Sequence, residues 1–495
     1  MAASLGELVA KSRKTILLAL IVLAGTLVIS RFDLPQHMSP LRISSKQSAT
    51  ELTTEVARRL AVWDAGPVWA HDDAIHANRL GCPYGTFFRD DFFFVKPNID
   101  YWRGVSRDDV RGLRRGLVQH VSDVITDGKP LVWSSELLYP PYQLTKPGTV
   151  RRGIIFGAGD GELLARLKES LHMLRIVLRS GLDVEIYHFR EELQDEAVRK
   201  SLETDYGPGI ALRTLGSKHD GKNYQVKTQG FINTEFSEFI WLDMDSIPLR
   251  DPAELFDSVE YKQSGHAFWS DHARDHPDNA VWRVLGRQCS DDHWPGESGQ
   301  LVFDKRGNNG MNLAVLHMAD HMTSETGTWG RMLHGDKDAF RYSFYLLGLA
   351  YQMAPRVMSA LGSLDANSNR FCGYSMLQYE LTPANKGWDA NYQHRPMFAH
   401  TMLHKLHREA SADQLFAYYR RPRLNHVNDT ALVRTPSPVR DWCYNYDLYG
   451  TDDLLDPENR YGDGQGMITA PFESLIDEDV WRALEIIAGR LTQIH

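Results

Sequence analysis

Two aspartates, Asp243 and Asp245, stand one residue apart at the end of an apolar stretch, and their spacing suits metal chemistry. The preceding residues 239–242 are apolar and prone to form strands, and Pro248 follows the second acid within three residues. This pattern is typical of a buried central strand that ends at the acids. Because ligands of open α/β sheets gather at the carboxyl ends of strands, we expect both carboxylates at the rim of a crevice. Paired hard oxygens there predict a nucleotide-sugar site built on Mn²⁺ or Mg²⁺.

The spacing alone is not specific, because two more Asp-x-Asp triplets occur at residues 336–338 and 477–479. The last triplet precedes Val480 and Trp481. Acids in the first turn of a helix complement the helix dipole, so this triplet predicts a helix start. For the first pair of acids, the structural alternative is a solvated turn after a strand.

A glycine loop and a lysine are the candidates for contact with the nucleotide. The apolar residues 153–156 run into a loop at 157–161, and its backbone amides, from Gly157 onwards, are expected to meet the nucleotide. A plain tight turn is the alternative. The loop lacks the full G-x-G-x-x-G spacing, which argues against a nicotinamide cofactor. Lys227 precedes the metal strand and is expected to neutralise phosphate, with a solvated helix lysine as its alternative.

Three later segments supply candidates for catalysis and for the remaining metal ligand. Glu297 lies between glycines ahead of an apolar stretch, which can aim a carboxylate into a cleft for sugar contact or catalysis. Asp336 is the second catalytic candidate, with helix capping as its alternative, and the adjacent Lys337 is expected to bind the nucleotide sugar. Of the histidines that follow residue 398, His400 is the first choice for a metal ligand and His404 the second.

Alternating strands and helices must position these side chains. Strand-prone runs at 153–156, 183–189, 210–213 and 239–242 are separated by segments with helical periodicity. This rhythm predicts an α/β fold with a mainly parallel central sheet, right-handed crossovers and flanking helices. Ahead of the sheet, apolar residues recur at helical spacing over residues 106–126 behind a Ser106 cap, which indicates a helical annex.

The bulk composition restricts the function and the compartment. The chain has 495 residues and a net charge of -9, which argues against a nucleic-acid partner. Its four cysteines are far apart and form no C-x-x-C pair, so zinc-ribbon and redox motifs have no support. In an oxidising lumen these cysteines can form two disulfides, with three possible pairings. The sequon at Asn428 is compatible with that compartment.

The N-terminus predicts a membrane anchor. Sixteen uncharged, mostly apolar residues, 15–30, follow a basic segment, and as a helix they would be about 24 Å long. The basic side belongs in the cytosol, so the expected topology is single-pass type II, with a cleaved signal peptide as the alternative. The expected divisions are a cytosolic tail at 1–14, the transmembrane anchor at 15–30, a stem at 31–54, an annex at 55–150, a catalytic domain at 151–410, and an extension at 411–495 that packs on it.

Several motifs, taken in order, resemble the fungal Golgi α-mannosyltransferases that extend mannan side chains, glycosyltransferase family 71. The resemblance covers residues 152–405. It rests on Lys227 sixteen residues before Asp243, the apolar run into Asp243-Met-Asp245, the Pro-x-x-Leu-Phe segment from Pro252, Glu297-Ser-Gly299 with Asp304-Lys305, and Gly335-Asp-Lys337. Met402 and Met244 depart from the family pattern, in which an asparagine and a small residue are usual.

The resemblance implies a GT-A type fold and an enzyme of the Golgi membrane. It implies GDP-mannose as donor, Mn²⁺ as cofactor, a mannoside acceptor on a glycoprotein or cell-wall glycan, and retention of configuration. Asp243 and Asp245 would bind metal and nucleotide, and Lys227 would contact the donor. The alternatives are a UDP-sugar donor, a haloacid-dehalogenase-like phosphatase, and an inactive subunit of a Golgi transferase complex.

Overall fold

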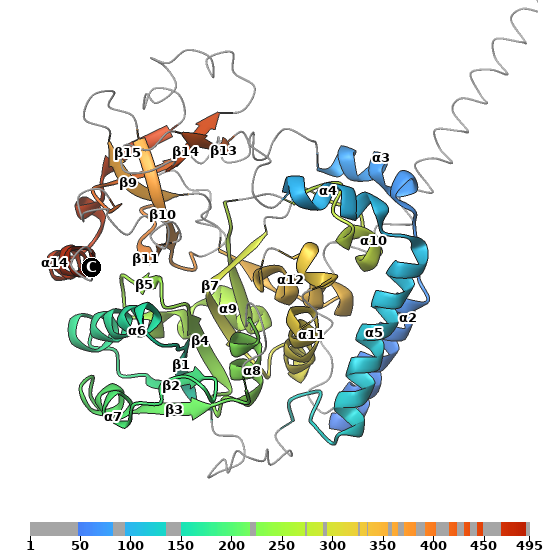
Figure 1. Cartoon of the computed structure of the whole chain (residues 1–495), viewed down its shortest axis with the longest axis horizontal. Coiled ribbons are helices and arrows are strands. Elements are labelled where there is room, and N and C mark those ends of the chain that lie inside the picture. The colour runs from blue at the N-terminus through green and yellow to red at the C-terminus, as the bar shows by residue number, and fades with distance from the viewer. Residues whose placement is uncertain are drawn as a thin grey trace, which may run out of the picture. The chain divides into compact units, whose positions relative to one another are not determined.

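The computed structural model (Figure 1) describes most of the chain after residue 47. The described residues are 48–82, 95–134, 150–217, 224–272, 275–290, 295–324, 327–333, 335–354, 359–364, 371–382, 392–401, 415–422, 430–435, 443–448 and 467–491. The chain divides into two units, 1–45 and 46–495, and every described residue belongs to the second.

A seven-stranded sheet with the order β3-β2-β1-β4-β7-β6-β8 forms the first layer. Its strands are β1 Arg152–Gly157, β2 Asp183–His188, β3 Ile210–Thr214, β4 Glu238–Leu242, β6 His266–Ser270, β7 Gly296–Asp304 and β8 Gln352–Met353. The neighbours β3, β2, β1 and β4 are parallel, as is the pair of β6 and β8, whereas β7 runs antiparallel to both β4 and β6. The prediction of a mixed α/β fold with a mainly parallel sheet is therefore confirmed.

Both faces of this sheet are buried, which explains the continuous apolar sequence of β4. Phe239 and Trp241 face one hydrophobic core, and Ile240 and Leu242 face another. The first core is covered by α8 Gln225–Asn233, α11 Asn312–Ser324 and α12 Lys337–Leu347, and the second by α6 Glu162–His172. Strand β4 thus lies at the centre of the domain, and its carboxyl end is held firmly in place.

Other short helices connect these elements. They are the π-helical turn Met173–Val177, α7 Glu196–Thr204, α9 Val259–Ser264, α10 Val281–Leu285, and the 3₁₀ helices Pro252–Asp257, Asn308–Gly310, Trp329–Arg331 and Phe472–Leu475. The expected helix start near residue 477 is observed, because α14 spans Glu478–Leu491 with two acids in its first turn.

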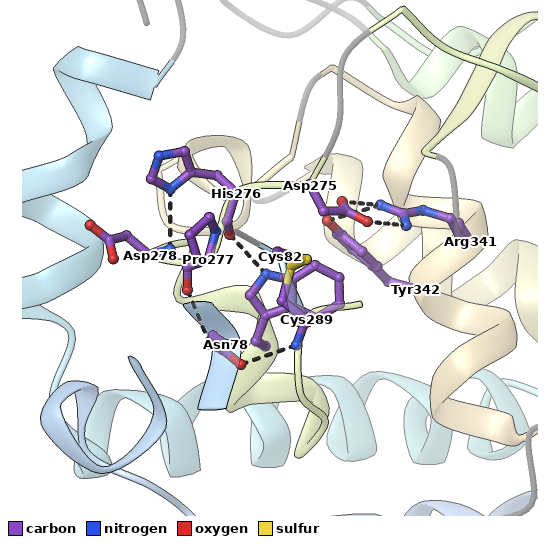
Figure 2. Close-up of a disulfide and its surroundings, with 10 residues drawn as sticks. Asn78, Cys82, Asp275, His276, Pro277, Asp278, Cys289, Arg341 and Tyr342 are labelled. Atoms are coloured by element: carbon purple, nitrogen blue, oxygen red, sulfur yellow. Dashed lines mark hydrogen bonds and ion pairs between the residues drawn. A yellow bond between two sulfur atoms is a disulfide. The ribbon is translucent and has the colours of Figure 1, made fainter. Parts of the chain in front are cut away.

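Four of the described helices precede the first sheet: α2 Ala49–Asp64, α3 His71–Gly81, α4 Val95–Gly104 and α5 Arg107–Thr126. Side chains of α2, α4 and α5 pack on the first core, as does Cys82, which directly follows α3. The predicted cap of α5 is present, since the Ser106 hydroxyl accepts a hydrogen bond from the Asp109 amide at 3.1 Å. Figure 2 shows the disulfide Cys82–Cys289, which joins the end of α3 to the segment after α10. The Asn78 side chain supports this joint by donating to the Pro277 carbonyl and accepting from the Cys289 amide.

A second sheet, which the sequence pattern did not indicate, consists of the strands β5 and β9 to β15. They are β5 Ser246–Pro248, β9 Ala360–Leu364, β10 Phe371–Tyr379, β11 Pro396–His400, β12 Tyr418–Pro422, β13 Thr430–Thr435, β14 Cys443–Leu448 and β15 Met467–Pro471. Its order is β13-β14-β10-β9-β12-β15, with β11 on the edge of β10 and β5 on β11. A disulfide, Cys372–Cys443, joins β10 to β14. In Figure 1, β5 lies between the first sheet and the orange strands of the second.

The predicted single-pass type II membrane topology is contradicted. Among the residues that the structure describes, no helix has both the length and the apolar character needed to cross a membrane. The longest of them, α5, has 20 residues, but charged side chains occur along its whole length. The proposed tail, the anchor at 15–30 and most of the stem, together with Asn428 and His404, lie outside the described residues.

Candidate metal and substrate site

The two aspartates lie where the chain passes from the first sheet to the second. Strand β4 ends at Leu242, and the Asp243 amide donates to the Gly299 carbonyl of β7 at 2.7 Å. The Ser246 amide then donates to the Asp243 carbonyl at 2.9 Å, which closes a tight turn before β5 begins. The Asp243 side chain is 30% exposed, whereas Asp245 is buried. The predicted apolar strand followed by two acids is therefore present, with the acids at its carboxyl end.

His400 reaches this turn from the second sheet. Strand β11 pairs antiparallel with β5, and the register places His400 opposite Ser246. Thr401 strengthens the connection, because its amide and its hydroxyl donate to the Asp245 carbonyl at 2.8 and 3.0 Å. The His400 Nε2 atom consequently lies 3.5 Å from Asp245 Oδ1.

Together, Asp243, Asp245 and His400 form a cluster that fits a divalent cation. One ligand atom from each residue lies within 4.8 Å of the others, and no other group of this kind occurs in the described ranges. Two carboxylates and one imidazole are a donor set that Mn²⁺ and related ions accept. The sequence selected all three residues, and the fold brings them together.

His400 is held on its other side by Glu297 and by a glycine. The His400 Nδ1 atom lies 3.3 Å from Glu297 Oε1. Burial opposes protonation of the imidazole, but the Glu297 and Asp245 carboxylates outweigh it and raise the pKa of His400 to about 10. A β-carbon at Gly299 would lie 2.6 Å from the His400 ring, so only glycine fits there. A cation would replace the proton of this imidazole, because histidine binds metals in its neutral form.

Glu297 is ionised at neutral pH despite its burial. Its Oε1 atom accepts hydrogen bonds from the amides of Ser298 and Gly299 at 2.9 and 2.8 Å. Burial disfavours the carboxylate, but His400, Lys337 and the Gly299 amide together lower the pKa of Glu297 to about 2. The tight glycine-flanked segment thus presents a charged carboxylate directly beside the metal cluster.

Lys227 forms contacts with protein groups that use all three of its donors. Its ammonium nitrogen lies 3.2 Å from Asp243 Oδ1, 2.6 Å from Asp336 Oδ2 and 2.8 Å from the Ser298 carbonyl oxygen. Burial opposes the charge, but Asp243 and Asp336 raise the pKa of Lys227 above its ordinary value. The Trp241 indole adds a second donor to Asp243, at 2.7 Å. These contacts fix the orientation of the Asp243 carboxylate.

Asp336 and Lys337, at the start of α12, also face the site. Asp336 makes no side-chain cap for this helix, and instead it accepts from the Ser298 hydroxyl at 2.9 Å and pairs with Lys227. Lys337 pairs with Asp271, which follows β6. Burial raises the pKa of Asp271, and the Lys337 ammonium opposes this increase. Asp271 was not among the predicted site residues, although an acid after an apolar strand is the same signal that identified Asp243.

Gly157 lies next to these groups, at the carboxyl end of β1. A β-carbon there would lie 3.1 Å from the Trp241 ring, so the glycine makes room for the indole that holds Asp243. His272 lies near Glu297, and burial lowers the pKa of this imidazole to about 3. His276 is also buried, but its Nδ1 atom accepts from the Asp278 amide at 3.1 Å, outside the metal cluster.

Comparison with known proteins gives a family that the chain resembles. Residues 151–283 and 291–380 match the family model described as "Mannosyltransferase putative". An α-1,2-mannosyltransferase of Candida albicans, MNN21, is 22% identical over 208 residues, which cover 34% of this chain and 32% of that protein. The chain therefore spans about a third of the length of this relative.

Solved glycosyltransferases are similar to parts of the chain. The bifunctional enzyme WbbM aligns with 41% of this chain and 38% of its own at 10% identity, with a TM-score of 0.30. The galactosyltransferase LgtC, solved with donor and acceptor sugar analogs, aligns over 39% and 70% at 13% identity, with a TM-score of 0.28. The family match and the Candida relative confirm the resemblance seen in the sequence: the chain is similar to a family of mannosyltransferases and to a fungal α-1,2-mannosyltransferase.

Proposed function

We propose that this chain is a metal-dependent, retaining α-mannosyltransferase of GT-A type, which transfers mannose from GDP-mannose to a mannoside acceptor. The observation that carries the proposal is the cluster of Asp243, Asp245 and His400 at the carboxyl end of β4. Both aspartates lie inside the region that matches the mannosyltransferase family. A phosphatase of the haloacid-dehalogenase type is disfavoured, because its motif follows the first strand of the domain and here three strands precede β4.

The three clustered residues would hold Mn²⁺, or Mg²⁺ in its place. When bound there, the cation supplies positive charge that stabilises the departing diphosphate. The chain fixes its ligands from both sheets. Lys227 and Trp241 orient Asp243, the Thr401 contacts secure the backbone of Asp245, and β11 presents His400. Such supporting contacts keep ligands in a productive arrangement.

Glu297 is the carboxylate that we assign to the reacting sugar. The mannosyl group passes through a state with positive charge at its anomeric carbon, and a nearby carboxylate stabilises that charge. Glu297 is ionised, and two backbone amides hold its Oε1 atom. Asp336, the other catalytic candidate, is bound by Lys227 and Ser298, so we assign it a positioning role.

Lys227 and Lys337 also act as positioning residues in this proposal. The donors of Lys227 are directed to Asp243, Asp336 and Ser298, and Lys337 is paired with Asp271. Backbone amides at the carboxyl end of β1, where Gly157 lies, would then contact the diphosphate beside a cation held by the cluster.

The test is a donor screen with the purified full-length chain. GDP-mannose and UDP-sugars are compared with Mn²⁺ and a mannoside acceptor, and transfer from GDP-mannose is expected to dominate. Asp245→Ala is expected to lower transfer by about 10²-fold or more, because it removes a cluster ligand. Asp123→Ala, which changes an exposed acid of α5, is the matched control. Strict preference for a UDP-sugar, or full transfer by Asp245→Ala, would refute the proposal.

A further inference from the structure

An aromatic pair joins the second sheet to the edge of the site. The Tyr444 ring of β14 is stacked on the His272 imidazole, with centroids 5.7 Å apart and planes inclined by 10°. Tyr444 is only partly buried, whereas His272 is buried. The functional assignments above use neither side chain.

Tyr444 is held rigidly by its own sheet. It pairs with Gly373 of β10 in the antiparallel register, and the preceding residue forms the disulfide Cys372–Cys443 with the same strand. The backbone of Tyr444 is therefore fixed by a hydrogen-bonded ladder and by a covalent link. A fixed and partly exposed aromatic ring loses little conformational entropy when a ligand binds to it.

The other half of the pair lies beside the proposed catalytic groups. His272 directly follows Asp271, whose amide donates to the Pro295 carbonyl at 2.9 Å, two residues before Glu297. Strand register also pairs Trp269 of β6 with Glu297 of β7. The charges of Glu297 and of His400 both act on the His272 imidazole.

The strand order separates this pair from the nucleotide side. In the order β3-β2-β1-β4-β7-β6-β8, Gly157 and the proposed diphosphate contacts lie at β1, on one side of the acids that follow β4. His272 follows β6, on the other side. A donor bound along β1 and β4 would leave the β7 and β6 side of the metal cluster for a second substrate.

We propose that Tyr444 and His272 form a binding platform for the acceptor, a hexopyranoside that presents an apolar C–H face to the aromatic ring. This assignment rests on the proposed transferase function. Asp271, whose side chain is 13% exposed, supplies a carboxylate that accepts hydrogen bonds from sugar hydroxyls. An aromatic surface with one or two fixed polar groups is the general design of a small-molecule site.

The test separates acceptor binding from donor chemistry. Binding of methyl α-mannoside to the full-length protein is measured by saturation-transfer NMR titration, without donor, and the KM values for acceptor and for GDP-mannose are measured separately. Tyr444→Ala is expected to weaken mannoside binding and raise the acceptor KM by about tenfold, equivalent to ~1.4 kcal/mol. GDP-mannose hydrolysis in the absence of acceptor, and the KM for GDP-mannose, are expected to remain unchanged.

Two further variants exclude a merely structural effect. Tyr444→Phe keeps the ring and should bind mannoside as the wild type does, whereas Tyr418→Ala removes a partly exposed tyrosine of β12 and should have no effect. Unchanged mannoside binding in Tyr444→Ala overturns the proposal, as does an equal loss in Tyr418→Ala or the absence of any mannoside binding to the wild type. A protein that binds mannoside through Tyr444 but does not use GDP-mannose would instead refute the donor assignment.

Discussion

The close approach of Gly299 to His400 yields a sharp test of the metal cluster. In Gly299→Ala, the new β-carbon would lie 2.6 Å from the Cε1 and Nδ1 atoms of the His400 ring. Ordinary contacts begin at 3.4 Å, so the ring and the strand must separate by about 0.8 Å. Neither can move freely, because His400 is buried in β11 and Gly299 is paired through its carbonyl with the Asp243 amide.

The substitution should displace one ligand of the cluster and leave both aspartates in place. Overpacking of this kind costs about 1–3 kcal/mol of folding stability. Misplacement of a ligand should lower the affinity for Mn²⁺ by about 10–100-fold, as disturbed outer-shell contacts do at other metal sites. Isothermal titration with Mn²⁺ measures the affinity, and thermal unfolding without metal measures the stability cost separately.

Gly112→Ala is the matched control, because a β-carbon at that position of α5 meets no atom within 4 Å. This change should leave the Mn²⁺ affinity unaltered and stabilise the helix by about 0.5–1 kcal/mol. Mn²⁺ binding by Gly299→Ala with the wild-type affinity would show that His400 is not a ligand, and the cluster would then have to be reduced to its two carboxylates.

Two other predictions concern buried charges. Lys227→Met should lower the free energy of unfolding by about 3–5 kcal/mol, because Asp243 and Asp336 lose their shared buried counter-charge. Lys262→Met removes an exposed ion pair with Asp257 and should lower the free energy of unfolding by no more than about 1 kcal/mol. Chemical denaturation measures both variants, and an equal loss in the two would contradict the role of burial. Burial lowers the pKa of His266 to about 3. The unfolded chain, with a histidine pKa near 6.5, therefore binds this proton at a higher pH than the folded chain does. The free energy of unfolding should consequently fall as the pH is lowered from 6.5 towards 3, by up to about 5 kcal/mol. His266→Gln should show a shallower decline, and an unchanged slope would refute the assignment.

The sequence was most informative where one strand carries a complete pattern. The apolar residues 239–242 of β4 predicted a central strand and placed Asp243 and Asp245 at its carboxyl end, because a strand buried on both faces reads as a continuous apolar run. His400 was predicted as a metal ligand from its chemistry alone, because an imidazole can complete the coordination of a metal that carboxylates already bind. The alternating elements around β4 also predicted the parallel half of the first sheet.

The sequence was least informative about the second sheet and the contacts between charges. Strands β9 to β15 are short and lie at irregular spacings, and their pairing is set by long-range register that periodicity does not encode. The partners of Lys227 were equally hidden, because Asp336 and Ser298 approach it only after α12 and β7 pack together. The membrane prediction relied on the apolar residues 15–30 and the basic segment before them, which lie outside the described residues, and no helix among the described residues could cross a membrane.

The turn between β4 and β5 has a thermodynamic consequence. Asp243 follows a strand of the first sheet, whereas His400 belongs to the second, so a cation shared by them would add a link between two layers that are already joined by hydrogen bonds and by the contact of His400 with Glu297. Any ligand that binds only the assembled state stabilises that state by mass action. If the cluster binds a cation, metal occupancy and the docking of the two layers would therefore reinforce each other, and loss of the ion would loosen the interface beside the proposed sugar site.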